Sequence, residues 1–274
     1  MNETVHNDAI RCRQLMQGGE YAAAMSEFRS LFSRCEAADR IVLVQEFSEF
    51  FEGGMSDELD VSLEYMQSDA MALISQTSYL ERVGMFGLAM AFRPQRLLEV
   101  GRSRGGSTVL LSCATCASGG QFISVDPNYQ MGEHFINRRL QQKLQNRGVI
   151  FLDGMSPTVV EEASRQIGGQ FDFVFIDADH SFESVVADLK GVLPFVEEGG
   201  YILLHDAHYA GVSDAIHKVV RSTGITDCGI VCPDANKESM HMTYRGRPVV
   251  WGGLHLLRVI RSGWIRRLCT RWLP

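Results

Sequence analysis

From Pro94 onward, short runs of apolar residues alternate with amphipathic segments along the chain. The apolar runs span 96–101, 121–126, 148–153, 171–177 and 200–206, and the amphipathic segments span 106–117, 132–147, 156–168, 181–195 and 211–222. Alternation of this kind predicts strands joined by helices into a parallel sheet. Because the strands are apolar on both faces, helices are expected on both sides of the sheet. The pattern predicts an α/β fold with a doubly wound, mostly parallel, Rossmann-like sheet.

The chain before this sheet has a helical pattern. Apolar residues recur at i, i+3 and i+4 between positions 10 and 32, and further helices are expected near 39–52, 58–75 and 77–91. We predict that residues 1–76 form an N-terminal helical segment that acts as a cap or as a dimerisation element, which implies a homo-oligomer. The Rossmann-like core is expected at 77–232.

The last part of the chain, residues 233–274, is predicted to hold a lid loop, the last strand and a basic amphipathic tail. Its polar stretch at 233–248 fits either a substrate lid or a β-hairpin arm, and 229–232 and 255–260 fit two final strands. In the tail, arginines interleave with leucine, isoleucine and tryptophan. Such a stripe suits either peripheral contact with anionic lipid or packing on the acidic N-terminal helices.

Composition narrows the class of protein. The 274 residues carry a formal charge of −7 with 45% hydrophobic and 22% charged residues, which is typical of a globular protein. The charge is divided unevenly, with −9 in residues 1–90, −5 in 91–238 and +7 in 239–274. The acidic pI of 5.6 argues against nucleic acid as a partner.

Targeting signals and cysteine spacing indicate where the protein works. The sequence has no run of 18 apolar residues and no apolar N-terminal signal, and its seven cysteines show no disulfide framework. We expect reduced thiols and a cytoplasmic protein, with contact at the inner membrane face through the tail as an open alternative.

A glycine-rich segment closes the first strand and opens the helix after it. It reads Glu99-Val-Gly101-Arg102-Ser103-Arg-Gly105-Gly106-Ser107. The glycine spacing differs from the dinucleotide pattern G-x-G-x-x-G, and no Lys-Ser/Thr follows as in a P-loop. Asp126 ends the second strand, 25 residues after Gly101, where an acid can accept both ribose hydroxyls. The two features together predict a nucleoside site.

These motifs, with SVDP at the second strand and FDFVFIDADH through GYILLHDA further on, resemble class I S-adenosylmethionine-dependent methyltransferases over about residues 77–225. The similarity is to the small-molecule O-methyltransferase group that includes macrolide-sugar, aminocoumarin-sugar and cephalosporin-pathway enzymes. The resemblance implies that the glycine segment holds the methionine part of S-adenosyl-L-methionine through Glu99, Gly101, Arg102, Ser103, Gly105, Gly106 and Ser107. It places the ribose on Asp126 and the adenine beside Asp153, Gly154, Met155 and Ser156.

Acids and histidines gather at the ends of the fourth and fifth strands. Clustered carboxylates repel one another unless they are protonated or bridged by a cation. The resemblance assigns a divalent metal, Mg²⁺ or Mn²⁺, to Asp177 and to an acidic pair of which Asp206 is the second member. Here His205 replaces the first acid, and a histidine fits Mn²⁺ or a heavier ion better than Mg²⁺. The alternative is that Asp177 only hydrogen-bonds the amino group of the cofactor and that His205 packs at the strand end.

Methyl transfer to a hydroxyl needs a group that removes the proton. His180 follows Asp177 by three residues, at the point where relatives carry a proposed base, and Asp179 is the rival for that role. The expected function is metal-assisted O-methyl transfer to a small polar acceptor, a sugar or glycan intermediate. The alternatives are a non-catalytic nucleotide-binding or assembly protein on the same fold, and a dehydrogenase, which the glycine spacing disfavours.

Overall fold

The computed structural model describes residues 74–127, 138–223, 225–232 and 237–260, together with positions 7, 10, 11, 14, 27, 71 and 136. For residues 237–241 it describes the backbone alone. Nearly all of the predicted N-terminal helical segment, and the arginine-rich stretch 261–274, therefore lie outside the described residues. Within the described ranges, no helix is long and apolar enough to cross a membrane.

The central sheet has seven strands in the order β3-β2-β1-β4-β5-β9-β6. Neighbours among the first five strands pair in parallel, whereas β9 pairs antiparallel with both β5 and β6. The predicted doubly wound, mostly parallel sheet is confirmed. Its strands are β1 (Arg96–Val100), β2 (Gln121–Asp126), β3 (Val149–Asp153), β4 (Phe171–Ile176), β5 (Val196–Leu204), β6 (Thr226–Ile230) and β9 (His255–Arg258).

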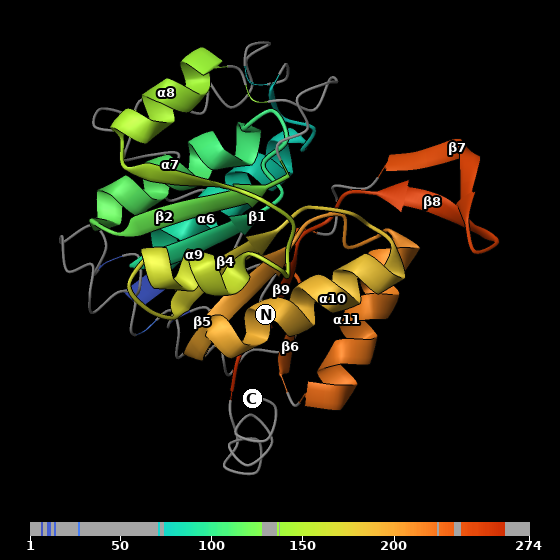
Figure 1. The fold of residues 1–274 in the computed structure, drawn as a ribbon. Helices are drawn as coiled ribbons and strands as arrows, with labels where there is room; N and C mark the ends of the chain where they lie inside the picture. The colour runs from blue at the N-terminus through green and yellow to red at the C-terminus, as the bar shows by residue number, and fades with distance from the viewer. Residues whose placement is uncertain are drawn as a thin grey trace.

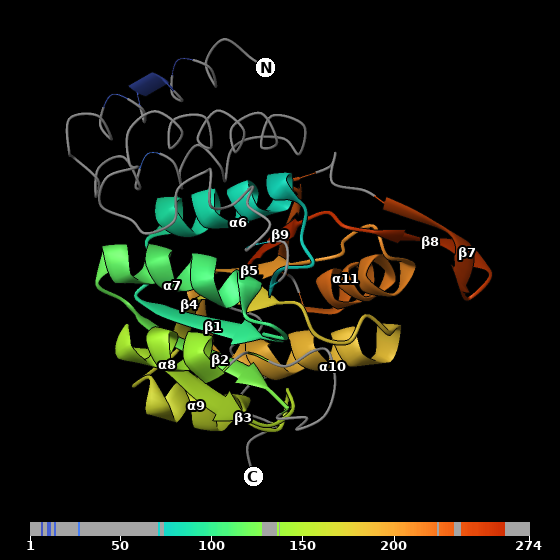
Figure 2. The same cartoon turned by 90° about the horizontal axis from the view of Figure 1, so that it is seen from above.

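Helices cover both faces of this sheet, as the apolar strands predict (Figures 1 and 2). One hydrophobic cluster joins the sheet to α6 (Tyr79–Phe92), α7 (Gly106–Ser118) and α8 (Arg138–Asn146). The other joins it to α9 (Val160–Gln166), α10 (Phe182–Val192) and α11 (Ala210–Thr223), with a short 3₁₀ turn, η1 (Leu193–Phe195), after α10.

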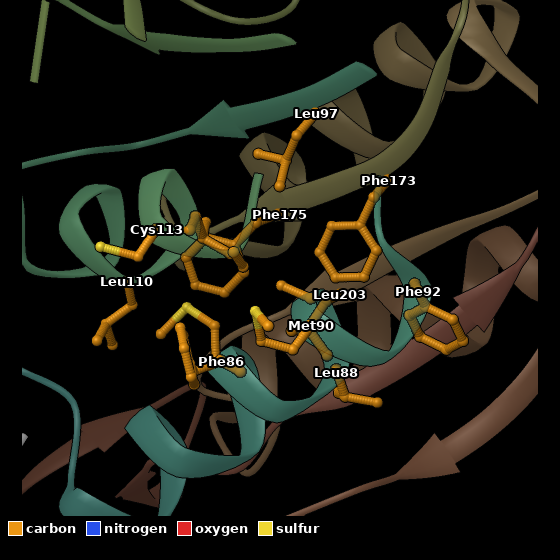
Figure 3. Packing of buried hydrophobic residues seen from close by; sticks show 14 of the residues in the cluster. Phe86, Leu88, Met90, Phe92, Leu97, Leu110, Cys113, Phe173, Phe175 and Leu203 are labelled. Atoms are coloured by element: carbon orange, nitrogen blue, oxygen red, sulfur yellow. The ribbon is translucent and has the colours of Figure 1, made fainter. Parts of the chain in front are cut away.

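Helix α6 is anchored firmly on the sheet. Figure 3 shows Phe86, Leu88, Met90 and Phe92 of this helix among side chains of β1, β4, β5 and α7. The ring of Phe92 stacks on Tyr201 of β5 with 4.1 Å between ring centroids. Each fully buried side chain of this size contributes roughly 1.5–3 kcal/mol to folding. The N-terminal end of α6 is thus held in a fixed place relative to the strand ends.

The strand order reverses between β1 and β4, because the chain proceeds to β2 and β3 on one side and to β4 and β5 on the other. In open α/β sheets, ligands bind outside the carboxyl ends of the strands at such a point. The two strand ends lie very close together, since a Cβ atom on Gly101 would be 2.0 Å from the backbone oxygen of Asp177. This approach explains the glycine at position 101.

An antiparallel hairpin is inserted between β6 and β9. It consists of β7 (Lys237–Tyr244) and β8 (Arg247–Trp251), joined at Arg245 and Gly246, which both have positive φ. Of the two alternatives for residues 233–248, a lid loop or a hairpin arm, the described residues form the arm. It extends away from the sheet, and the Tyr244 hydroxyl accepts a hydrogen bond from the Phe182 N–H at the start of α10 (Figures 1 and 2).

Candidate functional site

The glycine segment runs from the end of β1 into α7. Gly101 and Gly105 both have φ of +90°, which only glycine adopts readily, and Ser103 has φ of +43°. The N-cap residue of α7 is Gly105, which has no side chain to cap the backbone N–H groups of the first helical turn. The segment has the form expected of a loop that brings backbone close to a ligand.

Asp126, at the end of β2, holds this loop in place. Its Oδ2 atom accepts hydrogen bonds from the backbone N–H groups of Arg102, at 2.9 Å, and Ser103, at 3.1 Å. Both bonds use the same oxygen. The second oxygen, Oδ1, keeps its acceptor capacity for a ligand, which is the requirement for the predicted contact with a ribose.

The side chain of Arg102 acts as a brace beneath the loop. Its guanidinium donates to the backbone oxygens of Ser124 and Leu152 and to Asp153 Oδ1, the last at 2.7 Å, and it lies 5.3 Å from the ring centroid of Phe151. These bonds tie the first loop to the ends of β2 and β3. The sequence placed Arg102 in the cofactor loop but gave no signal that its side chain turns inward.

Glu99 is fully buried beneath the same loop. Hydroxyl groups of Ser107, Thr108 and Ser124 all donate to its carboxylate, at 2.6, 2.8 and 2.6 Å. Burial raises the pKa of Glu99 to about 7, because desolvation of the charged form outweighs these hydrogen bonds. The Ser107 hydroxyl and the Glu99 carboxylate are therefore hydrogen-bonded to each other beneath the loop.

The segment predicted to flank the adenine leaves β3 next to the end of β2. Asp126 and Asp153 are register partners on the two strands, and the Gly154 N–H donates to the Asp126 backbone oxygen at 3.1 Å. Met155 is 59% exposed, which is unusual for an apolar side chain and leaves its surface available to a planar ligand. Ser156 follows directly. The predicted ribose and adenine residues therefore lie side by side at one edge.

The acids and histidines after β4 and β5 form one cluster. Inward-facing atoms of Asp177, His180, His205 and Asp206 all lie within 4.8 Å of one another. His180 Nε2 is 2.8 Å from Asp206 Oδ2, and His205 Nδ1 is 3.1 Å from Asp177 Oδ1 and 3.3 Å from Asp206 Oδ2. Carboxylate oxygens and imidazole nitrogens at these separations fit a divalent metal ion.

The electrostatics of the cluster are those of opposite charges at close range. Burial by itself lowers the pKa of His180, but hydrogen bonds and charges of Asp177 and Asp206 outweigh it and raise that pKa to about 9. His205 is affected in the same way, and its pKa lies well above the usual range for histidine. In return, the pKa of Asp177 falls to about 2 despite burial. The imidazole rings and the carboxylates therefore stabilise each other's charged forms.

Asp179, the alternative candidate for the base, faces the start of helix α10. Its carboxylate accepts hydrogen bonds from the Ser181 N–H, the Ser181 hydroxyl and the Ser184 hydroxyl at the start of α10. His180, in contrast, lies inside the cluster and is 26% exposed. The structure thus brings His180, and not Asp179, next to Asp177 and Asp206.

Glu81, in the first turn of α6, is a member of the site that the sequence did not reveal. Its Oε1 atom is 3.1 Å from His205 Nε2 and accepts a 2.7 Å hydrogen bond from the Gly253 N–H, while Oε2 accepts from the Ser78 N–H. In the sequence, Ser78 and Glu81 have the spacing of an ordinary capping box, and the structure forms that box. No local pattern shows that the same carboxylate also reaches β5.

Aromatic rings form one wall beside His180. The ring of Trp251 lies 5.5 Å from His180 at an interplanar angle of 88°, and Tyr209 lies 5.0 Å from both Trp251 and Tyr244. Trp251 and Tyr244 come from the hairpin arm, and Tyr209 comes from the loop after β5. The arm therefore contributes to the surface next to the cluster.

Comparison with known proteins bears on the same part of the chain. Residues 98–207 match the sequence profile of a family described as "Methyltransferase domain". Tricin synthase 1 from Oryza sativa subsp. japonica is 28% identical over 121 residues, which are 43% of this chain and 47% of that protein. The chain thus spans about half the length of this curated relative.

Two solved structures are reported for comparison. The O-methyltransferase from Bacillus cereus in complex with SAH aligns with a TM-score of 0.53 and 16% identity over 79% of this chain and 100% of that chain. The O-methyltransferase TomG from Streptomyces achromogenes, in complex with SAM, gives a TM-score of 0.49 and 14% identity over 71% and 91%. The fold is that of the class I methyltransferases.

Proposed function

Because residues 98–207 match a methyltransferase domain profile and the fold is that of an O-methyltransferase, we propose that this protein transfers the methyl group of S-adenosylmethionine to a hydroxyl of a small polar acceptor. The observation that carries the proposal is the convergence of the glycine loop, Asp126, Asp177 and His180 on one edge of the sheet, at the reversal of strand order. On one side of this edge, the glycine loop and Asp126 suit a nucleoside. On the other side, Asp177 and His180 can accept or release a proton.

The chain's own residues supply binding and orientation of the methyl donor. The loop N–H groups and the start of α7 face the amino-acid part, Asp126 Oδ1 accepts from the ribose hydroxyls, and the exposed Met155 lies against the adenine. Because a methyl transfer needs the nucleophile in line with the methyl carbon, fixed positions of both substrates contribute most of the rate. When bound, S-adenosylmethionine would supply an electrophilic methyl group, and these residues would hold it in line with the acceptor oxygen.

His180 is proposed as the acceptor of the hydroxyl proton, in the neutral form that it would take once a dication held by Asp177, His205 and Asp206 offsets the negative charge that raises its pKa. Its Nε2 lies 3.6 Å from Asp177 Oδ1 and 2.8 Å from Asp206 Oδ2, and its ring lies next to the aromatic wall of Tyr209 and Trp251. A divalent metal held by Asp177, His205 and Asp206 would lower the pKa of a coordinated hydroxyl. The carboxylate and imidazole donors of the cluster support this part of the proposal.

The acceptor is proposed to be a sugar or another hydroxylated ring. Flat aromatic side chains such as Trp251 and Tyr209 provide the kind of surface on which a ring packs, and the adjacent His180 lies where a ring hydroxyl would react. Methyl transfer to methyl glycosides and, in parallel, to catechol, followed by mass spectrometry, distinguishes a sugar from a phenol. Inhibition by EDTA, reversed by added metal, tests metal assistance.

The nucleoside side is tested by Asp126→Asn. The amide oxygen still accepts the N–H groups of Arg102 and Ser103, but the amide nitrogen cannot accept from a ribose hydroxyl. We expect S-adenosylhomocysteine to bind about tenfold or more weakly in isothermal titration calorimetry. Glu161→Ala, which removes an exposed acid from α9, is the matched control and should bind normally. Equal affinity in Asp126→Asn and the wild type would contradict the assignment.

A further inference from the structure

The metal site of this protein differs in its donor atoms from one built only of acids. We propose that the cluster of Asp177, His205 and Asp206 holds a first-row transition-metal dication such as Mn²⁺ in preference to Mg²⁺, and that Glu81 determines this preference by fixing which ring nitrogen His205 presents. The inference rests on the metal assistance stated under the proposed function.

The donor set provides the first argument. His205 Nδ1 lies 3.1 Å from Asp177 Oδ1 and 3.3 Å from Asp206 Oδ2. Neighbouring ligands of an octahedral ion with bonds of about 2.1 Å are about 3 Å apart, so His205 Nδ1 fits a position adjacent to each of the two carboxylate oxygens around one ion. Magnesium favours oxygen ligands, whereas imidazole nitrogen favours transition metals. A nitrogen in this position therefore shifts the selectivity of the site.

Glu81 decides which nitrogen faces the ion. Its Oε1 atom lies 3.1 Å from His205 Nε2, on the side of the ring that points away from Asp177. A carboxylate only accepts hydrogen bonds, so Nε2 must carry the proton in this contact. When a metal ion takes the place of the proton on Nδ1, the ring presents the lone pair of Nδ1 to that ion, between the two acids. Carboxylates that orient metal-binding histidines in this way affect metal affinity 10- to 100-fold.

The Glu81 carboxylate is held so that it cannot turn away. Its side chain is 3% exposed, Oε2 accepts from the Ser78 N–H, and Oε1 also accepts from the Gly253 N–H. The preceding residue, Gly252, donates its N–H to Asp206 Oδ1. One short backbone segment therefore fixes both a proposed ligand and the residue that orients another, which joins α6, β5 and the loop before β9 in a single arrangement.

Isothermal titration calorimetry with MnCl₂ and with MgCl₂ on the full chain tests the preference, and the electron paramagnetic resonance spectrum of bound Mn²⁺ reports its ligands. We expect the wild type to bind Mn²⁺ about tenfold or more tightly than Mg²⁺. Glu81→Gln replaces the carboxylate with a neutral amide, which cannot accept hydrogen bonds at both oxygen positions and lacks the charge that stabilises a proton on Nε2, so the orientation of the His205 ring is fixed less strongly. Mn²⁺ affinity should then fall about 10- to 100-fold.

Two further variants separate the orienting role from a structural one. Ser78→Ala removes the hydroxyl of the capping box but leaves the contact between Glu81 and His205, so Mn²⁺ affinity should stay within about twofold. His205→Asn replaces the nitrogen donor with an amide oxygen and should reduce the ratio of Mn²⁺ to Mg²⁺ affinity to near one. It also decides the question if Glu81→Gln does not fold.

Binding of S-adenosylhomocysteine, measured on the same samples, separates this inference from the proposed function. Equal Mn²⁺ and Mg²⁺ affinity in the wild type, wild-type Mn²⁺ affinity in folded Glu81→Gln, or an unchanged preference in His205→Asn would each overturn the inference. Failure of the wild type to bind S-adenosylhomocysteine would instead count against the proposed function.

Discussion

At the scale of single residues, the acids at the strand ends could be predicted from the sequence. The buried side chains that contact the site from other elements could not. Asp126, Asp177 and Asp206 directly follow apolar runs, so the edge of the sheet where they meet was predictable. Glu81 and Arg102 could not be assigned in this way, because their roles depend on contacts across 124 and 51 residues of sequence. Such contacts exist only after the helices pack on the sheet.

Glu99 should make the stability of the protein fall as pH rises. The folded state keeps this proton up to a pKa of about 7, whereas the unfolded chain releases it near the usual value of 4.5. The unfolded state therefore binds fewer protons between these values, and roughly 3 kcal/mol is lost across the range. Urea unfolding at pH 5 and pH 8 should show a smaller loss for Glu99→Gln than for the wild type. An identical loss in both proteins would show that Glu99 does not titrate in this range.

His180 should matter for turnover far more than its neighbour. General acid–base groups contribute about 10²- to 10⁴-fold to rate, so His180→Ala should reduce the rate of methyl transfer by a factor in that range. Asp179→Asn is the control, because this side chain is occupied by Ser181 and Ser184 and should change the rate only a few-fold. A larger loss in Asp179→Asn than in His180→Ala would reverse the assignment of the base.

At the scale of elements, periodicity predicted the sheet well and its insertions less well. The five parallel strands and the helices between them follow from alternating apolar runs, and β6 and β9 were anticipated as final strands. The hairpin of β7 and β8 remained one of two alternatives, because the polar residues of 233–248 suit a loop as well as strands. The hairpin is recognised in the structure by its contacts with the core, such as the hydrogen bond from the Phe182 N–H to the Tyr244 hydroxyl.

The approach of β1 to β4 can be tested with a pair of glycines. Gly101 and Gly119 both have positive φ, but a Cβ atom on Gly101 would be 2.0 Å from the Asp177 backbone oxygen, whereas one on Gly119 would meet nothing within 4 Å. Both substitutions to alanine carry the conformational cost of about 1–2 kcal/mol. Gly101→Ala should cost at least about 2 kcal/mol more in urea unfolding, because the strand ends must separate. Equal losses would mean that the two strand ends are not in close contact.

At the scale of the whole molecule, the described residues form one core with the methyltransferase fold, and its candidate functional groups meet at a single edge. The uneven charge along the chain places −9 in residues 1–90 and +7 in residues 239–274, on either side of this core. Part of the predicted basic tail belongs to the core itself, since Leu256 and Leu257 are buried in β9 and Arg258 lies over the ring of Tyr201. Any contact of the tail with a membrane would therefore involve the residues after Ile260.

The central claim is that this edge binds S-adenosylmethionine rather than a nicotinamide dinucleotide. The most direct measurement is isothermal titration calorimetry of the wild-type protein with S-adenosylhomocysteine, NAD and NADP. The glycine spacing, the second oxygen of Asp126 and the exposed Met155 predict saturable binding of S-adenosylhomocysteine and no binding of either dinucleotide. Binding of NAD or NADP without binding of S-adenosylhomocysteine would contradict the proposed function.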